Sequence, residues 1–190
     1  MDGVRPGGDR RIDRVLAEGY LDQLGQRPLE EIRALREQAD QEETDLSYLR
    51  RLLQGRLDLV QDELQRRAEG RPVPADLVAH LTRVLSDDAT RAAAPGSGRH
   101  RTAEPSRAGD SRRHVEQLVS DDLLTDLPQR SDDELGLAAA TLRTEEASVS
   151  GQRSAVQKVF DAVSAEITRR YREGEADVGA LLSATGDPDR

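Results

Sequence analysis

The stretch LEEIRALREQADQEETDLSYLRRLLQGRLDLVQDELQRR, residues 29–67, contains no proline and decides the fold. Pro28 stands in front of it, where the first turn of a helix accepts a residue without an N–H group. Apolar residues follow at spacings of three and four, as in a coiled-coil seam: Leu46, Leu49, Leu53, Leu57, Val60 and Leu64. The sequence therefore predicts one long helix over residues 28–69, roughly 60 Å long at about 1.5 Å per residue.

A second stretch has the same character. Ser131-Asp132-Asp133-Glu134 matches a capping box, in which a serine and a later glutamate satisfy the first backbone N–H groups of a helix. We expect that helix over residues 131–173, with the apolar positions Leu142, Val149, Val156, Phe160, Val163 and Ile167. Because runs of β-branched residues are missing as well, the predicted fold class is all-α, with two long helices and short flanking amphipathic helices.

Both predicted long helices carry the same five polar residues at the same spacing, 103 residues apart. The first copy is Glu43, Ser47, Arg50, Gln54 and Asp58, and the second is Glu146, Ser150, Arg153, Gln157 and Asp161. At about 100° per residue, this spacing places all five side chains of a copy within roughly 80° of one helix face. Each pentad is therefore a polar strip beside the apolar seam, along which a ligand could lie.

The duplication extends beyond the pentads at the same offset. Leu21, Leu24, Gln26, Arg27, Glu31, Glu63, Arg66 and Arg67 recur as Leu124, Leu127, Gln129, Arg130, Glu134, Glu166, Arg169 and Arg170. A match without gaps over about 50 residues indicates a tandem supersecondary unit. We therefore divide the chain into a first helical repeat, 1–86, a flexible linker, 87–113, and a second helical repeat, 114–190.

Short amphipathic segments flank the long helices. We expect them at Arg10–Glu18, at residues 74–86 and at residues 115–124, with a weaker helical tail at Asp177–Leu182. The linker is rich in Ala, Gly, Ser, Pro and Arg and has no apolar period. It would allow the two repeats to fold back on each other.

Composition excludes several classes of function. A net charge of −9 and a pI near 4.9 disfavour direct nucleic-acid binding and favour a basic protein partner. The chain has no cysteine, and its three histidines are isolated, so neither a thiolate nor a histidine metal site is expected. No signal peptide or membrane span is predicted, and we expect a cytoplasmic protein.

The chemistry of the pentads suits a guanine nucleotide. Guanine presents its N1–H and N2–H₂ donors together on one edge, which suits a carboxylate, whereas adenine lacks these paired donors. Asp58 and Asp161 would read that edge, and Glu43 and Glu146 would take further donors. Arg50 and Arg153 would bind O6 and N7, stack on a base or meet phosphate. The serines and glutamines would add neutral contacts to phosphate, ribose or base.

The motif E-xxx-S-xx-R-xxx-Q-xxx-D in two copies resembles the signature of the RsiG family, the cyclic-di-GMP-responsive anti-sigma factors of filamentous actinomycetes. All ten motif positions match. The resemblance implies an antiparallel coiled coil whose two pentads hold a partially intercalated dimer of cyclic-di-GMP, two molecules per chain. It also implies that the loaded protein sequesters WhiG, a sporulation sigma factor. One chain carries both motifs, so a monomer is expected before the complex forms.

Two other readings remain. In a structural coiled-coil adaptor without nucleotide binding, the pentads would be surface ion pairs at the border of the seam. An enzyme has the least support, because the sequence shows no nucleophile and base in reach, no glycine-rich phosphate loop and no metal cluster.

Overall fold

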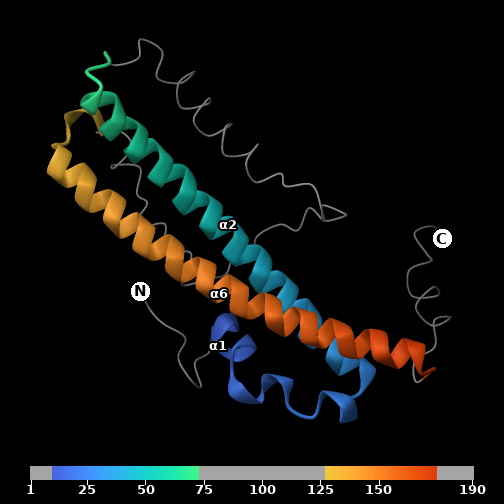
Figure 1. Ribbon diagram of the computed structural model, residues 1–190. Coiled ribbons are helices and arrows are strands. Elements are labelled where there is room, and N and C mark those ends of the chain that lie inside the picture. The colour runs from blue at the N-terminus through green and yellow to red at the C-terminus, as the bar shows by residue number, and fades with distance from the viewer. Residues whose placement is uncertain (1–9, 73–126, 175–190) are drawn as a thin grey trace, which may run out of the picture. The chain divides into compact units, whose positions relative to one another are not determined.

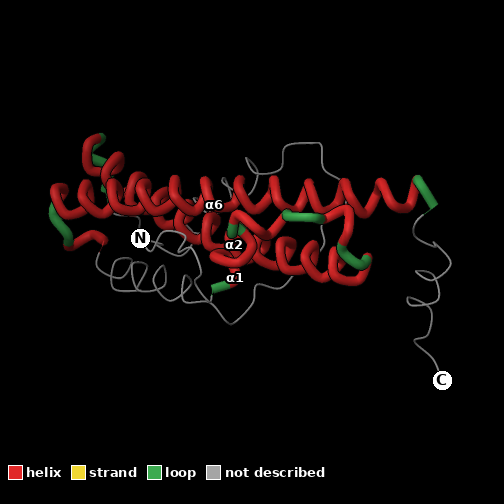
Figure 2. Tube along the Cα trace, turned by 90° about the horizontal axis from the view of Figure 1, so that it is seen from below, coloured by secondary structure: helices red, strands yellow, loops and turns green. Residues whose placement is uncertain are grey.

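The computed structural model describes residues 10–72 and 127–174. In chain order these contain α1 (Arg11–Val15), the 3₁₀ helices η1 (Glu18–Leu21) and η2 (Leu24–Gln26), α2 (Leu29–Ala68), the 3₁₀ helix η3 (Leu127–Gln129) and α6 (Asp132–Arg172). These residues form helices, turns and loops and no strand (Figure 2). The two long helices pack against each other, so the predicted fold class is confirmed (Figure 1).

The contacts divide the chain into two compact units, each of which takes part of both long helices. The first unit comprises residues 44–72 and 127–153 of the described chain, and the second comprises residues 10–43 and 154–174. In the first unit, Arg67 near the end of α2 contacts Asp132 at the start of α6. In the second unit, Arg33 near the start of α2 contacts Tyr171 near the end of α6. The helices are therefore antiparallel within each unit.

A seven-residue repeat buries the seam. On each long helix, every seventh residue is apolar and at most 3% exposed: Ile32, Ala39, Leu46, Leu53 and Val60 on α2, and Leu135, Leu142, Val149, Val156 and Val163 on α6. This spacing keeps one stripe facing a partner helix, and full burial of a Val or Leu side chain stabilises by about 1.5–3 kcal/mol. The two series lie 103 residues apart, so the duplication copies the seam together with the pentads.

Helix ends follow the predicted signals with small differences. The capping box is present: the Ser131 backbone N–H donates to Glu134 Oε2 at 2.8 Å, and the Glu134 N–H donates to Ser131 Oγ at 3.3 Å. Pro28 lies just outside α2 rather than in its first turn, and its carbonyl accepts from the Ile32 N–H at 3.2 Å. Gly70 and Gly174 follow the two helices with φ of 64° and 72°, conformations that glycine adopts without strain.

The N-terminal segment of the second unit packs on α2. Ile12 and Val15 of α1 and Tyr20 of η1 are buried, and the Tyr20 hydroxyl donates to the Leu35 carbonyl at 2.8 Å. Asp13 is also buried, but two hydrogen bonds from Arg10, at 2.7 and 2.8 Å, satisfy its carboxylate. The predicted helix at Arg10–Glu18 is therefore shorter than expected and continues as 3₁₀ turns. The predicted segments at 74–86, 115–124 and 177–182 and the linker at 87–113 lie outside the described residues.

Candidate functional site

Seven of the ten pentad residues belong to the first unit. Ser47, Arg50, Gln54 and Asp58 come from α2, and Glu146, Ser150 and Arg153 come from α6. All seven side chains are half-buried, as expected for strips that border a packed seam. Because their helices are continuous and regular, the spacing that the sequence predicted is the spacing that the backbone provides.

The two strips meet at Glu146. Arg50 Nε and Gln54 Nε2 both donate to Glu146 Oε1, each at 3.0 Å. These bonds join the first pentad to the second, so both strips border the same side of the helix pair in this unit. The Arg50 and Glu146 side chains are 37% and 22% exposed, and an ion pair with that access to solvent contributes at most about 1 kcal/mol.

The register of the helices brings the centres of the two strips to the same level. Residues 50 and 54 contact residue 146, and residue 67 contacts residue 132, so positions on α2 advance as positions on α6 decrease. This register places Ser47 and Arg50 level with Arg153 and Ser150. The first unit thus combines two guanidinium groups, two carboxylates, two hydroxyls and one amide on adjoining faces, with their formal charges balanced.

The remaining three pentad residues lie in the second unit. Glu43 and Gln157 are half-buried, and Asp161 is exposed. Gln157 Nε2 donates to Asp161 Oδ1 at 3.0 Å on its own helix. Its counterpart Gln54 donates across the seam, so the two copies of the motif differ in their contacts even though they have the same sequence.

A second duplicated cluster lies at the C-terminal end of each long helix. Glu63 accepts from Arg66 at 2.6 and 2.8 Å and from Arg67 at 2.6 Å. Arg67 also donates to the carbonyls of Leu127, at 2.9 Å, and Arg130, at 2.7 Å. It therefore anchors η3, the turn that leads into α6. We call Glu63, Arg66 and Arg67 the first clamp.

The second clamp repeats this arrangement. Glu166 accepts from Arg169 at 2.9 Å and from Arg170 at 2.8 Å, and Arg170 donates to the Leu24 carbonyl at 2.8 Å. Leu24 lies in η2, before α2, and is the counterpart of Leu127. The duplication contained these residues, but sequence reasoning did not assign them a role, because a bond to a backbone carbonyl leaves no signal in residue types.

The arginines of each clamp lower the pKa of the clamp glutamate. Hydrogen bonds from Arg169 and then Arg170 lower the pKa of Glu166 to about 2. The pKa of Glu63 is also lowered, first by the hydrogen bond from Arg66. Both carboxylates therefore stay ionised and hold their arginines in place at neutral pH.

The described residues contain neither a metal-ion cluster nor a membrane-spanning helix. Within 10–72 and 127–174, no three His, Asp or Glu side chains gather in a way that could hold a metal ion. Among the described helices, none combines the length and the apolar character that crossing a bilayer requires.

Comparison with known families agrees with the pattern of residues. The family model described as RsiG-like matches residues 18–85 and 121–185, which together make up most of the chain. The chain belongs to the RsiG-like family. The two matched segments start 103 residues apart, and they contain both pentads and both clamps. No curated protein matches the chain. Membership of the RsiG-like family indicates an anti-sigma role, which is regulatory rather than catalytic, with a sigma factor as partner.

Proposed function

We propose that this protein is an anti-sigma factor that binds cyclic-di-GMP through the ten pentad residues and, when loaded, sequesters a sporulation sigma factor of the WhiG kind. The observation that carries this proposal is the meeting of the two pentads at Glu146, where Arg50 and Gln54 of one strip reach the carboxylate of the other. A ligand bound along one strip would therefore touch both.

The donors and acceptors in the first unit suit guanine. A carboxylate such as Asp58 or Glu146 accepts from guanine N1–H and N2–H₂, and a guanidinium such as Arg50 or Arg153 donates to O6 and N7. The arginines also offset phosphate charge. Ser47, Ser150 and Gln54 complete the polar contacts of the first unit.

Ligand binding would replace existing contacts between pentad side chains with contacts to the nucleotide. The Arg50–Glu146 ion pair would give way to contacts with the nucleotide, at a cost of at most about 1 kcal/mol because the pair is partly exposed. The pair thus satisfies both groups and opens at little cost.

Symmetry supports the same ligand. Cyclic-di-GMP has two identical halves, and the chain has two copies of one strip on antiparallel helices, which offer matching contacts to both halves. Two nucleotides bring four phosphate charges to strips with a net charge of −2. The carboxylates must then face guanine edges and the arginines must face phosphates or O6/N7.

Inhibition of the sigma factor would follow from occlusion. The DNA-contacting surface of a sigma factor is basic, and a partner with a net charge of −9 can cover it. In our proposal, the bound nucleotide holds the two long helices together and thereby fixes the surface that the sigma factor recognises. This function places the protein in the cytoplasm, as a monomer before the complex forms.

The experiment is a calorimetric titration of the full chain with cyclic-di-GMP, with cyclic-di-AMP as the control nucleotide. We expect guanine-selective binding near two nucleotides per chain. The variant Asp58→Ala, Asp161→Ala should lose at least tenfold in affinity, because each carboxylate reads a guanine edge that no other group would satisfy.

A matched variant, Glu37→Ala with Asp133→Ala, removes the same number of negative charges at exposed positions outside the pentads. It should bind like the parent. Equal affinity for both nucleotides, or equal loss in the two double variants, would contradict the proposal.

The contacts also favour one other function, a structural coiled-coil adaptor. Glu146 is bonded to Arg50 and Gln54, and Gln157 is bonded to Asp161, as expected if the pentads serve only as ion pairs and hydrogen bonds at the surface. An adaptor predicts no heat with either nucleotide and the same thermal unfolding temperature with or without cyclic-di-GMP.

A further inference from the structure

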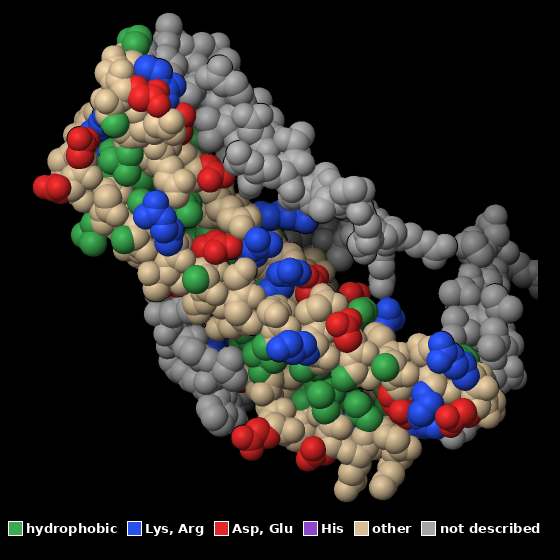
Figure 3. All heavy atoms as spheres, in the orientation of Figure 1, with side chains coloured by type: hydrophobic (Ala, Val, Ile, Leu, Met, Phe, Trp, Pro, Cys, Tyr) green, Lys and Arg blue, Asp and Glu red, His purple; other side chains and the backbone are tan. Residues whose placement is uncertain are grey.

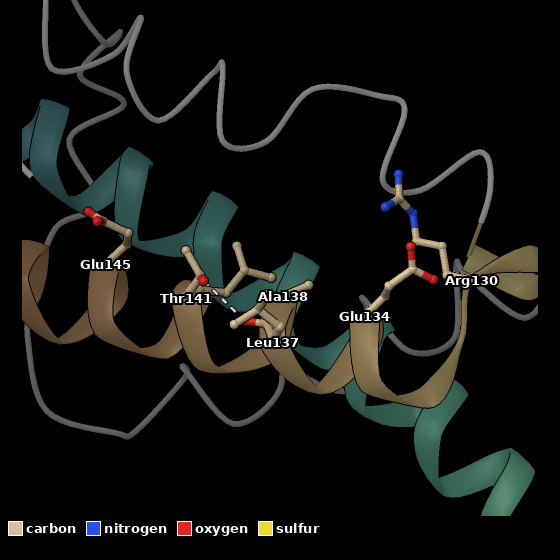
Figure 4. A pocket seen from close by; sticks show the side chains of 7 residues that line it. Arg130, Glu134, Leu137, Ala138, Thr141 and Glu145 are labelled. Carbon is tan, nitrogen blue, oxygen red and sulfur yellow. Dashed lines mark hydrogen bonds between the residues drawn. The ribbon is translucent and has the colours of Figure 1, made fainter.

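An open groove of about 300 Å³ runs along the N-terminal part of α6 in the first unit. Its lining includes Arg130, Glu134, Leu137, Ala138, Thr141 and Glu145. Figure 4 shows Arg130 and Glu134 close together at one end of this stretch and Glu145 at the other. Leu137 is 72% exposed, and Figure 3 shows hydrophobic side chains reaching the surface along this part of α6. The groove presents apolar surface between charged ends.

The counterpart of this groove in the second unit is covered. A shift of 103 residues maps the groove onto residues 27–42, where α1 and η1 pack on α2. Tyr20 donates to the Leu35 carbonyl, and Arg11 Nε lies 3.8 Å from Glu42 Oε2. Leu35 and Glu42 correspond to Ala138 and Glu145 of the groove. In the first repeat, the corresponding face of α2 is therefore covered by residues 10–22.

The covering segment is itself duplicated. Arg10, Ile12, Asp13, Val15, Tyr20 and Leu21 have the counterparts Arg113, Val115, Glu116, Leu118, Leu123 and Leu124. Each pair keeps its type: basic, apolar or acidic, with leucine replacing the tyrosine. Leu124 also precedes η3 by as many residues as Leu21 precedes η2, and both turns are anchored by a clamp arginine.

A buried donor in the groove points to the same occupant. Arg130 Nε is buried and has no hydrogen-bond partner among the described residues. Its counterpart, Arg27 Nε, donates to the Asp22 carbonyl at 3.0 Å, within the covering segment. The residue corresponding to Asp22 is Thr125, whose carbonyl would accept from Arg130. A buried donor without a partner destabilises the folded chain, so this bond would favour docking.

We infer that the groove on α6 is the docking site of residues 113–125 of the same chain, which pack there as residues 10–22 pack on α2. In this arrangement Leu118 takes the place of Val15, which is completely buried, and His114 takes the place of Arg11, opposite Glu145. The docked segment gives each repeat its own covering segment before the long helix.

Paramagnetic labelling of the full chain tests this inference. The chain contains no cysteine, so Thr141→Cys introduces a single attachment point in the groove. A nitroxide there should broaden the amide NMR signals of residues 115–124. Gln38 is the counterpart of Thr141, and a nitroxide at Gln38→Cys should broaden the signals of residues 12–21, which gives the expected size of the effect.

The added variant Leu118→Asp should abolish the broadening at residues 115–124, because a carboxylate would have to enter an apolar site. Circular dichroism would check that the long helices remain. No broadening in the parent would overturn the inference and leave the groove to another protein. Broadening only when a labelled chain is mixed with an isotope-labelled second chain would also overturn it, because the occupant would then be a second copy.

Discussion

Tyr20 shows how one residue ties the N-terminal segment to α2. Burial raises the pKa of Tyr20 to about 12, and its hydroxyl donates to the Leu35 carbonyl. The folded protein therefore keeps the proton at pH values where the unfolded chain, with a pKa of about 10, releases it. Deprotonation favours the unfolded state, so the free energy of unfolding should fall between about pH 10 and about pH 12.

The variant Tyr20→Phe should lose about 0.5–1.5 kcal/mol at neutral pH, since one hydrogen bond is removed. It should also lack this part of the alkaline decrease. Urea unfolding of both proteins across that range provides the measurement, and parallel decreases would show that Tyr20 is not its source.

The two clamp carboxylates give the opposite dependence on pH. The pKa of Glu166 is lowered to about 2 by its arginines, from 4.5, and that of Glu63 is lowered in the same way. The stabilisation from Glu166 is present above about pH 4.5 and is lost as the pH falls towards about 2, because the unfolded chain takes up protons first. The stabilisation from Glu63 is lost in the same direction as the pH falls.

We expect the variant Glu63→Gln, Glu166→Gln to unfold at lower urea concentration at pH 7 and to show a flatter decrease in acid. Glu37→Gln, at an exposed position, provides the control. A decrease as steep as in the parent would assign acid sensitivity to other carboxyl groups.

For single residues, the sequence predicted the helix face of each side chain but not its contacts. Spacing alone placed each pentad on one face, because α2 and α6 are regular. It could not predict that Gln54 reaches across to Glu146 while Gln157 binds Asp161, since side-chain rotamers depend on neighbours from other elements. It also missed Glu42 and Glu145, which are only 8% exposed and directly precede the first residue of each pentad.

Among the elements, the long helices were predicted to within one residue at each end, because their seam, cap and proline signals agree. The 3₁₀ turns η1, η2 and η3 were not predicted. Segments of three or four residues have no period to detect, and the backbones of η2 and η3 are held by hydrogen bonds from distant arginines. Gln23, with a positive φ of 52° between η1 and η2, likewise gives no sequence signal.

Removal of a clamp arginine should loosen the element that it anchors. Arg67→Ala loses hydrogen bonds to two carbonyls, to Glu63 and to Asp132, and we expect about 1–3 kcal/mol of destabilisation. Arg67→Lys should recover only part of it, because an ammonium lacks the forked geometry of the guanidinium. Arg51→Ala, at an exposed position on the same helix, is the control, and an equal shift in the urea midpoint would contradict the anchoring role.

At the scale of the whole molecule, charge should govern the encounter with a sigma factor. The net charge of −9 attracts a basic surface, and salt screens that attraction over about 8–10 Å at physiological ionic strength. Under the proposed function, the association rate of the cyclic-di-GMP-bound protein with a WhiG-type sigma factor should fall steeply as salt rises, while the dissociation rate changes little. Stopped-flow measurements at several salt concentrations would check this, and a rate independent of salt would argue against charge steering.

Of the features of the whole chain, the internal duplication was the one most completely visible in the sequence. One offset relates the seam residues, the pentads, the clamps and the turns that the clamps hold. The division into two compact units could not be predicted from the sequence, because each unit joins parts of both long helices that lie far apart along the chain. Contacts of that kind depend on the antiparallel register, which follows from packing rather than from the repeat.

The second clamp can close only late in the synthesis of the chain. Arg170 and the carbonyl that it holds at Leu24 are 146 residues apart. A ribosome delivers the N-terminus first, at about 5–20 residues per second, so the turn before α2 waits many seconds for its anchor. The first clamp, by contrast, joins residues 60 apart and can close while the rest of α6 is still being synthesised. The nascent chain should therefore secure the entry to α6 before the entry to α2, although α2 is translated first.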